Sequence, residues 1–129
     1  ANPPYMKSGT GKTPANRAKA LATIEGDAGL GNWLEFCLAR TTPSGTVTIV
    51  HRHDRLGEIL DYLGDGHGRD AVMPLIPTLG AAPKRILVQV TKGQDGPISE
   101  NIGLILHEDG RNYTNMAEAI LRHAQPLNM

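Results

Sequence analysis

The chain has 129 residues, with 13 basic and 13 acidic side chains, a length that suits a single domain. Balanced charge excludes a protein whose whole surface coats nucleic acid, although it allows a local basic patch. The single cysteine, Cys37, excludes an intrachain disulfide and fits a reducing cytosol. No apolar run is long enough to span a bilayer. We therefore expect a cytoplasmic protein with no membrane association.

The first residues form a stiff loop, Asn2-Pro3-Pro4-Tyr5. Two consecutive prolines cannot join a helix interior or a central strand, and each biases the preceding residue toward an extended backbone. The loop therefore presents a side-chain amide, fixed carbonyl groups and an aromatic ring.

Two glycine-rich stretches follow this loop, with a short helix predicted to start at Thr13-Pro14. Residues 8–13 resemble a phosphate-binding loop, but Met6 stands where the pattern requires a glycine. Residues 26–31 resemble a cofactor turn, but no convincing strand precedes them. The sequence favours a flexible loop at the first stretch and an ordinary turn at the second.

The first strong helix signal is an apolar face with helical spacing. Its members are Leu30, Trp33, Leu34, Cys37 and Leu38. A turn at Thr42–Gly45 ends this helix, and we interpret Cys37 as part of the core. The β-branched run Thr46–Val50 predicts a buried strand.

The middle of the chain predicts one helix and two further strands. Asp54 is the expected cap of a helix that ends near Gly64. The apolar face of this helix contains Leu56, Ile59, Leu60 and Leu63. The strands are Ala71–Ile76, bounded by Pro74 and Pro77, and Ile86–Val90, which residues 93–97 end.

Beyond these strands, Ile102–Leu106 is a short apolar stretch, and Asp109-Gly110 forms a turn. Thr114 caps the last predicted helix, which brings Met116, Ala119 and Ile120 together before Pro126. The predicted order of strand, helix, strand and strand is typical of the closing half of an open α/β sheet. We expect the two strands joined by the helix to be parallel neighbours in this sheet. Three strands make this sheet thin.

The opening tetrapeptide is suited to bind and activate an amine or amide nitrogen. The exocyclic amine of adenine, like a side-chain amide nitrogen, is a poor nucleophile because its lone pair is delocalised. Two acceptors that hold its N–H groups can turn this lone pair out of conjugation toward an electrophile. Asn2 offers its side-chain oxygen and Pro3 its carbonyl, both held by proline geometry. These acceptors also favour the positive charge that develops on nitrogen. Tyr5 offers a face for a planar base or amide.

The tetrapeptide resembles the substrate-amine motif of S-adenosylmethionine-dependent amino-methyltransferases of the Rossmann-like class. In that family it follows the fourth strand, at the carboxyl edge of the sheet. Further segments resemble most the bacterial tRNA(Val) adenine-N6 methyltransferases, and this similarity spans nearly the whole chain. The segments are Trp33–Leu38, Thr42–Gly45, Ile49–Arg52, Lys84–Gln89, Leu106–Gly110 and Tyr113-Thr114.

The resemblance implies methyl transfer to the N6 amine of an adenine in tRNA. Asn2, Pro3 and Pro4 would form the amine site, Tyr5 would stack on the unstacked adenine, and Asn2 alone would border S-adenosylmethionine. No residue is expected to bind a metal: His51 and His53 flank Arg52, but no third ligand lies at a telling spacing. Basic side chains with no acid among them could contact tRNA phosphates, namely Lys7, Lys12, Arg17 and Lys19.

The family's glycine-rich cofactor turn lies before the tetrapeptide, where this chain has only Ala1. We therefore expect the carboxy-terminal half of a methyltransferase domain, with strands five to seven and most of the S-adenosylmethionine pocket absent. The expected divisions are a substrate loop at 1–31, sheet and helices at 32–93, and a tail with the last helix at 94–129. This chain alone should be inactive. It should also self-associate, most simply as a two-fold dimer along the exposed edge of Thr46–Val50 or through the neighbouring helix face.

Three alternatives remain open at this stage. The tetrapeptide is shared with enzymes that methylate glutamine N5 in proteins. A non-catalytic module that binds RNA or a partner would use only the fold remnant and the basic loop. A circularly permuted enzyme would use Gly26–Gly31 as its cofactor turn.

Overall fold

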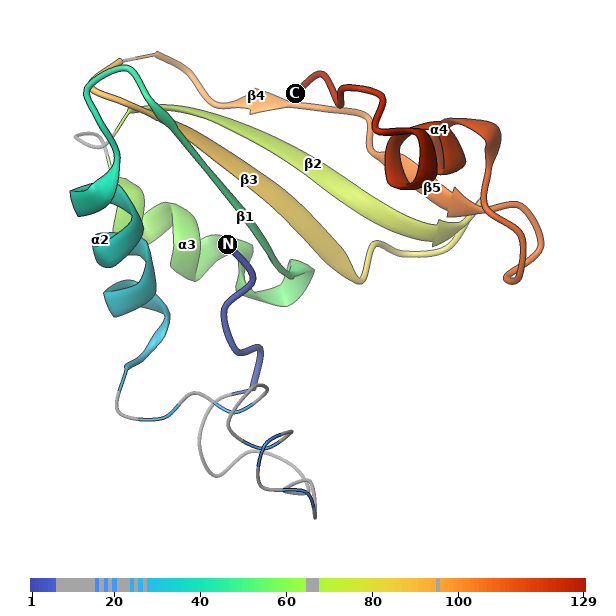
Figure 1. Ribbon diagram of the computed structural model, residues 1–129, viewed down its shortest axis with the longest axis horizontal. Helices are drawn as coiled ribbons and strands as arrows, with labels where there is room; N and C mark the ends of the chain where they lie inside the picture. The colour runs from blue at the N-terminus through green and yellow to red at the C-terminus, as the bar shows by residue number, and fades with distance from the viewer. Residues whose placement is uncertain are drawn as a thin grey trace.

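The computed structural model describes residues 1–6, 16, 18, 20, 24, 26, 28–64, 68–94 and 96–129, with the backbone alone for 68–70 (Figure 1). The helix expected at Thr13-Pro14 lies outside the described residues. The secondary-structure elements are α2 (Leu30–Arg40), β1 (Thr46–Arg52), the 3-10 helix η1 (His53–Arg55), α3 (Leu56–Leu63), β2 (Gly68–Thr78), β3 (Arg85–Lys92), β4 (Ser99–Glu100), β5 (Leu104–His107) and α4 (Asn115–His123).

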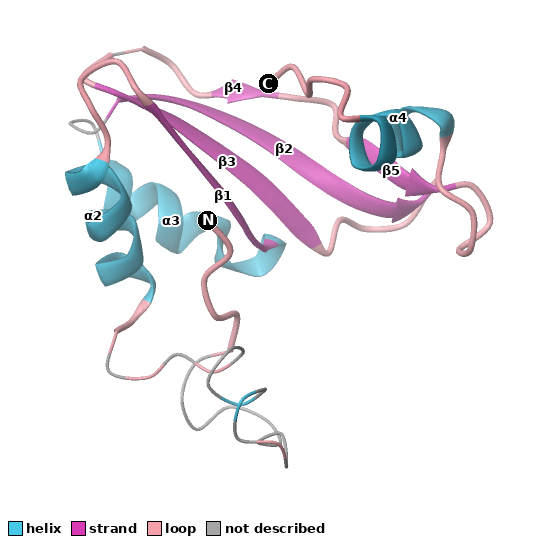
Figure 2. Cartoon of the chain, viewed as in Figure 1, coloured by secondary structure: helices cyan, strands magenta, loops and turns pink. Residues whose placement is uncertain are grey.

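The strands form one mixed sheet in the order β1-β3-β2-β4, and β5 also pairs with β2 (Figure 2). β3 is antiparallel to both long neighbours, with Val88 opposite Ile49 of β1 and Val72 of β2. β1 and β2 therefore run in the same direction without touching. The expectation that the strands joined by a helix would be neighbours is wrong, because β3 returns between them.

Helices α2 and α3 cover one face of the sheet, and an aliphatic core fills the space between them. Strand residues alternate between faces, so one set of side chains from β1 and β3 points toward the helices. The buried core residues are Leu30, Leu34, Leu38, Val47, Ile49, Ile59, Leu63, Val72, Ile86, Val88 and Val90. Cys37 packs against this core, as predicted.

Close contact between the two helices explains one glycine. A Cβ at Gly31 would lie 3.0 Å from the ring of Tyr62 in α3. Gly31 is already helical, because α2 begins at Leu30. Gly31 therefore serves helix packing, which gives this glycine a structural reason without a cofactor turn.

β2 is longer than predicted and runs through both prolines. The backbone N–H of Asn101 donates to the Val72 carbonyl, so alternate residues from Val72 onward face β4 and β5. The N–H that Pro74 lacks would point into the gap between these two short strands. Pro77 lies beyond Leu75, the last β2 residue paired with β3. Neither proline therefore costs a ladder hydrogen bond.

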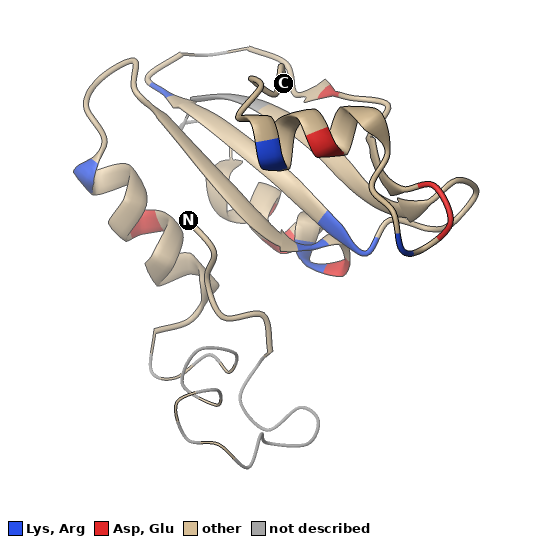
Figure 3. Ribbon diagram, turned by 45° about the vertical axis from the view of Figure 1, so that its right-hand side comes forward, with Lys and Arg blue, Asp and Glu red and all other residues tan. Residues whose placement is uncertain are grey.

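The end of the chain adds more to the sheet than expected. β4 and β5 pair with β2 in parallel, and α4 lies on the face opposite α2 and α3 (Figure 3). Thr114 caps α4 by accepting a hydrogen bond from the N–H of Ala117, as predicted. The α/β fold class is thus confirmed, with two short strands added. None of the helices in the described part of the chain is long and apolar enough to cross a membrane.

Candidate functional site

The opening loop is anchored to the outer edge of β1. The amino group of Ala1 donates to the Thr48 carbonyl at 2.7 Å, and the N–H of Val50 donates to the Ala1 carbonyl at 3.1 Å. This is the hydrogen-bond pattern of a parallel pair, with Ala1 opposite Ile49. The following residues therefore leave the sheet at the carboxyl end of β1 (Figure 1). Ligands of open α/β sheets bind at such ends.

Tyr5 holds the loop together through three contacts. Its hydroxyl donates to Oδ1 of Asn2, which fixes the amide side chain. Its ring meets the His51 ring edge to face, with 5.2 Å between centroids. The guanidinium carbon of Arg85 lies 5.7 Å from the Tyr5 ring centre. The ring is therefore positioned by residues from β1 and β3.

The two proline carbonyls differ in their surroundings. His51 is fully buried, and its Nε2 lies 3.4 Å from the carbonyl oxygen of Pro4. Among the described residues, no hydrogen bond to the Pro3 carbonyl is found. Asn2 is exposed, and its Oδ1 keeps a second lone pair beside the bond from Tyr5. Asn2 Oδ1 can therefore accept an incoming N–H group at the surface, whereas Pro3 is a buried residue whose carbonyl has no hydrogen-bond partner among the described residues.

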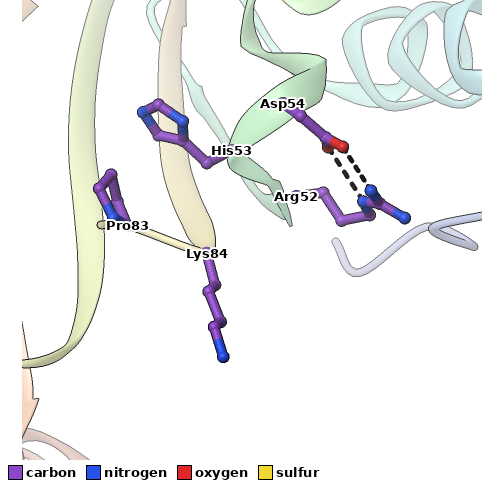
Figure 4. Close-up of a pocket in the computed structure, with 5 residues that line it drawn as sticks. All are labelled: Arg52, His53, Asp54, Pro83 and Lys84. Atoms are coloured by element: carbon purple, nitrogen blue, oxygen red, sulfur yellow. Dashed lines mark hydrogen bonds and ion pairs between the residues drawn. The ribbon is translucent and has the colours of Figure 1, made fainter. Parts of the chain in front are cut away.

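A hollow of about 370 Å³ opens where β1 ends and β3 begins (Figure 4). It is lined by Arg52, His53, Asp54, Pro83 and Lys84. The N–H of His53 donates to the Lys84 carbonyl at 3.1 Å, which ties η1 to the start of β3. The volume is within the range of small-ligand sites.

Asp54 does not cap α3, contrary to the prediction. The residue at the N-cap is Arg55, without a side-chain cap, because η1 precedes the helix. Asp54 instead forms a two-bond ion pair with Arg52, drawn in Figure 4. Hydrogen bonding to Arg52 holds the pKa of the Asp54 carboxyl below its ordinary value. The same bond raises the pKa of Arg52.

Several predicted site features cannot be placed in the structure. The four basic residues Lys7, Lys12, Arg17 and Lys19 lie outside the described residues, so their RNA contacts stay a prediction. The same holds for the loop at 8–13. His51 packs against Tyr5 and Pro4, and no three potential metal ligands gather anywhere in the described part of the chain.

Sequence reasoning did not identify His51 and Arg85 as partners of Tyr5. They are separated from it by long stretches of chain, and only the pairing of β1 with β3 brings them together. A signal was present, because both residues lie in segments that carry the family resemblance, Ile49–Arg52 and Lys84–Gln89.

No protein-family model and no curated protein matches this chain. Among solved structures it is similar to a predicted O-methyltransferase from Agrobacterium tumefaciens, with a TM-score of 0.66 and 23% sequence identity. The match covers 75% of this chain and 48% of that one, so the chain spans about half the length of that structure. At this identity the likeness shows the fold alone. The chain has part of a methyltransferase fold.

Proposed function

We propose that the chain provides the amine-binding part of an S-adenosylmethionine-dependent N-methyltransferase that acts on the exocyclic N6 amine of an adenine in tRNA. The observation that carries this proposal is the parallel register of Ala1 with Ile49, which delivers Asn2–Tyr5 to the carboxyl end of β1. A proline-stiffened pair of acceptors at that edge is suited to bind an amine with two N–H groups.

The chemistry asked of the loop is modest. Asn2 Oδ1 and the Pro3 carbonyl would accept the two N–H groups and turn the nitrogen lone pair out of conjugation. The nitrogen would gain an N–C bond as the C–S bond of the methyl donor breaks and leaves a neutral thioether, and the methylated nitrogen would then release one proton to solvent. Both acceptors stabilise the positive charge that develops on nitrogen before that loss. No side chain that titrates near neutral pH is required.

S-adenosylmethionine supplies the electrophilic methyl group when it is bound. The loop offers acceptors for an amine rather than a set of groups that would hold a nucleoside cofactor. We therefore assign Asn2 alone to the border of the cofactor site, and no other described residue to its binding.

The experiment that tests this proposal compares two substrate classes in one assay. The protein in its natural length is incubated with methyl-labelled S-adenosylmethionine and either an unmodified tRNA pool or glutamine-containing peptides. Label in tRNA should be recovered as N6-methyladenosine after nuclease digestion. Label recovered as N5-methylglutamine would replace adenine with a protein substrate. Label in neither, with RNA binding retained, would leave a non-catalytic RNA-binding module.

A matched pair of variants links the label to the loop. Tyr5→Phe keeps the ring but removes the bond to Asn2, whereas Tyr5→Leu removes the stacking face as well. We expect a smaller loss of rate for the first than for the second, because base stacking on an aromatic ring contributes about 1–3 kcal/mol. Equal turnover in both variants and the parent would contradict the role given to Tyr5.

A further inference from the structure

Two arginines lie directly opposite each other where β1 ends and β3 begins. Arg52 pairs in register with Arg85, so the two side chains leave the sheet on the same face. Like charges in such a pair destabilise a sheet. Lys84 precedes Arg85 and lines the adjoining hollow. Three cationic residues therefore lie at one end of the sheet, with Arg52 and Arg85 on one face and Lys84 turned toward the other.

The charges at this end are only partly compensated. Asp54 forms its ion pair with Arg52. Neither Lys84 nor Arg85 forms an ion pair with another described residue, and both are exposed. Figure 4 shows the Lys84 side chain extending away from the Arg52–Asp54 pair. A net positive charge thus remains beside the hollow.

One of these cations, Arg85, contacts the amine-binding loop. Arg85 reaches over one face of the Tyr5 ring, so the base would stack on the face that Arg85 leaves uncovered. A nucleotide bound at Tyr5 would therefore have the Arg85 guanidinium, at the start of β3, beside it. An arginine fork and a lysine are the side chains best suited to bind phosphate oxygens.

We propose that the hollow lined by Arg52, His53, Asp54, Pro83 and Lys84 is a phosphate site for single-stranded RNA, in which Lys84 contacts a backbone phosphate next to the target adenine, while Arg85 contacts the strand from the Tyr5 side. The inference rests on the function proposed above. Asp54 acts in the opposite direction, because its carboxylate neutralises Arg52 and repels a phosphate. Proteins that bind single strands combine such cations with an aromatic ring.

The test measures binding of a fluorescent twelve-nucleotide single-stranded RNA by anisotropy at four salt concentrations. Lys84→Gln and Arg85→Gln should each weaken binding about three- to tenfold at low salt. Each should also reduce the slope of log affinity against log salt by about 0.7. Asp54→Asn should have the opposite sign and strengthen binding, because it releases Arg52. Arg85→Lys should retain most of the affinity.

Arg111→Gln is the matched control, because Arg111 is an exposed cation on the connection between β5 and α4. Unchanged affinity and slope in the Lys84 and Arg85 variants would overturn the phosphate site, as would an equal loss in the Arg111 control. Equal binding of a poly-aspartate peptide would overturn the assignment to RNA. Should Arg85→Gln fail to fold, Lys84→Gln decides alone.

The failure of this inference can be separated from failure of the proposed function. The substitutions at Lys84 and Arg85 should lower RNA affinity without changing which amine is methylated. If adenine is methylated but these residues do not affect the salt dependence of RNA affinity, the phosphate site is rejected and the proposed methyltransferase function stands. If these residues contribute to salt-dependent RNA binding but no adenine is methylated, the phosphate site stands and the proposed methyltransferase function is rejected.

Discussion

Two regions of the molecule differ in what holds them together. The face of the sheet beneath α2 and α3 is an aliphatic core whose side chains are almost completely buried. The carboxyl end of β1 is instead held by a few polar and ring contacts from Asn2, Tyr5, His51 and Arg85. Substitutions in the first region should therefore change the free energy of unfolding, and substitutions in the second should change rate or binding.

The largest expected effect concerns the outer side of β1. β3 pairs with all seven β1 residues on one side, whereas on the other Ala1 covers only the Thr48 carbonyl and the Val50 N–H among the described residues. An edge with open N–H and C=O groups invites pairing. We predict a two-fold dimer at micromolar concentration, which corresponds to about 8 kcal/mol. Sedimentation should show twice the monomer mass.

A single variant tests whether this edge is the interface. Backbone N–H groups alternate in direction along β1, and that of Val50 points outward to Ala1. The N–H of Thr46 therefore also points away from β3. Thr46→Pro should therefore leave the β1–β3 ladder intact and abolish the dimer. A parent chain that sediments as a folded monomer would rule out this self-association.

The next effect is in the core. Ile59 of α3 is completely buried, so Ile59→Ala should lower the free energy of unfolding by about 2–5 kcal/mol through lost burial and a residual cavity. Ile59→Val, as the conservative control, should cost about 0.5–1.5 kcal/mol. Urea unfolding gives both numbers. Methyl transfer per folded molecule should be unchanged, and a selective loss of rate would break the separation between the two regions.

A smaller effect is expected where β3 meets α2. The ammonium group of Lys92 donates to the carbonyls of Leu38 and Thr41, at 2.8 and 2.9 Å, and so satisfies the end of the helix. Lys92→Met retains the aliphatic stem but removes both bonds. Unfolding in urea should show a loss of about 1–3 kcal/mol, against almost none for Lys84→Met.

The smallest effect is that of the exposed Arg52–Asp54 pair, whose side chains are 48% and 59% exposed. Because the pKa of Asp54 is lowered in the folded state, its stabilisation is present above the ordinary value of 3.8 and is lost as pH falls through the folded value. Solvent screening limits it to under about 1 kcal/mol. Asp54→Asn should therefore be slightly less stable at pH 7 and equal to the parent in strong acid. A difference that grows on acidification would contradict this.

The sequence predicted the elements whose signals are local. Helical spacing located α2 and α3, β-branched runs located β1 and β3, and Thr114 was recognised as a cap. It failed where tertiary context decides. β2 runs past both ends of the predicted Ala71–Ile76 and through Pro77, which lies beyond the last residue paired with β3, and Asp54 pairs with Arg52 instead of capping α3.

The candidate site was also only partly predictable. The chemistry of Asn2–Tyr5 can be inferred from four adjacent residues, because the prolines fix their backbone. The contacts of Tyr5 with His51 and Arg85 cannot, since they depend on the register between β1 and β3. The cationic end at Lys84 and Arg85 depends on the same register.

The measurement that tests the central claim most directly is the rate of N6-methyladenosine formation in tRNA by the natural-length protein carrying Asn2→Ala. Removal of one preorganised polar group from such a site costs about a hundredfold or more in rate. We predict at least that loss, with the free energy of unfolding and the affinity for S-adenosylmethionine close to those of the parent. Turnover within a factor of two of the parent would contradict the assignment of Asn2 as the acceptor that holds the amine.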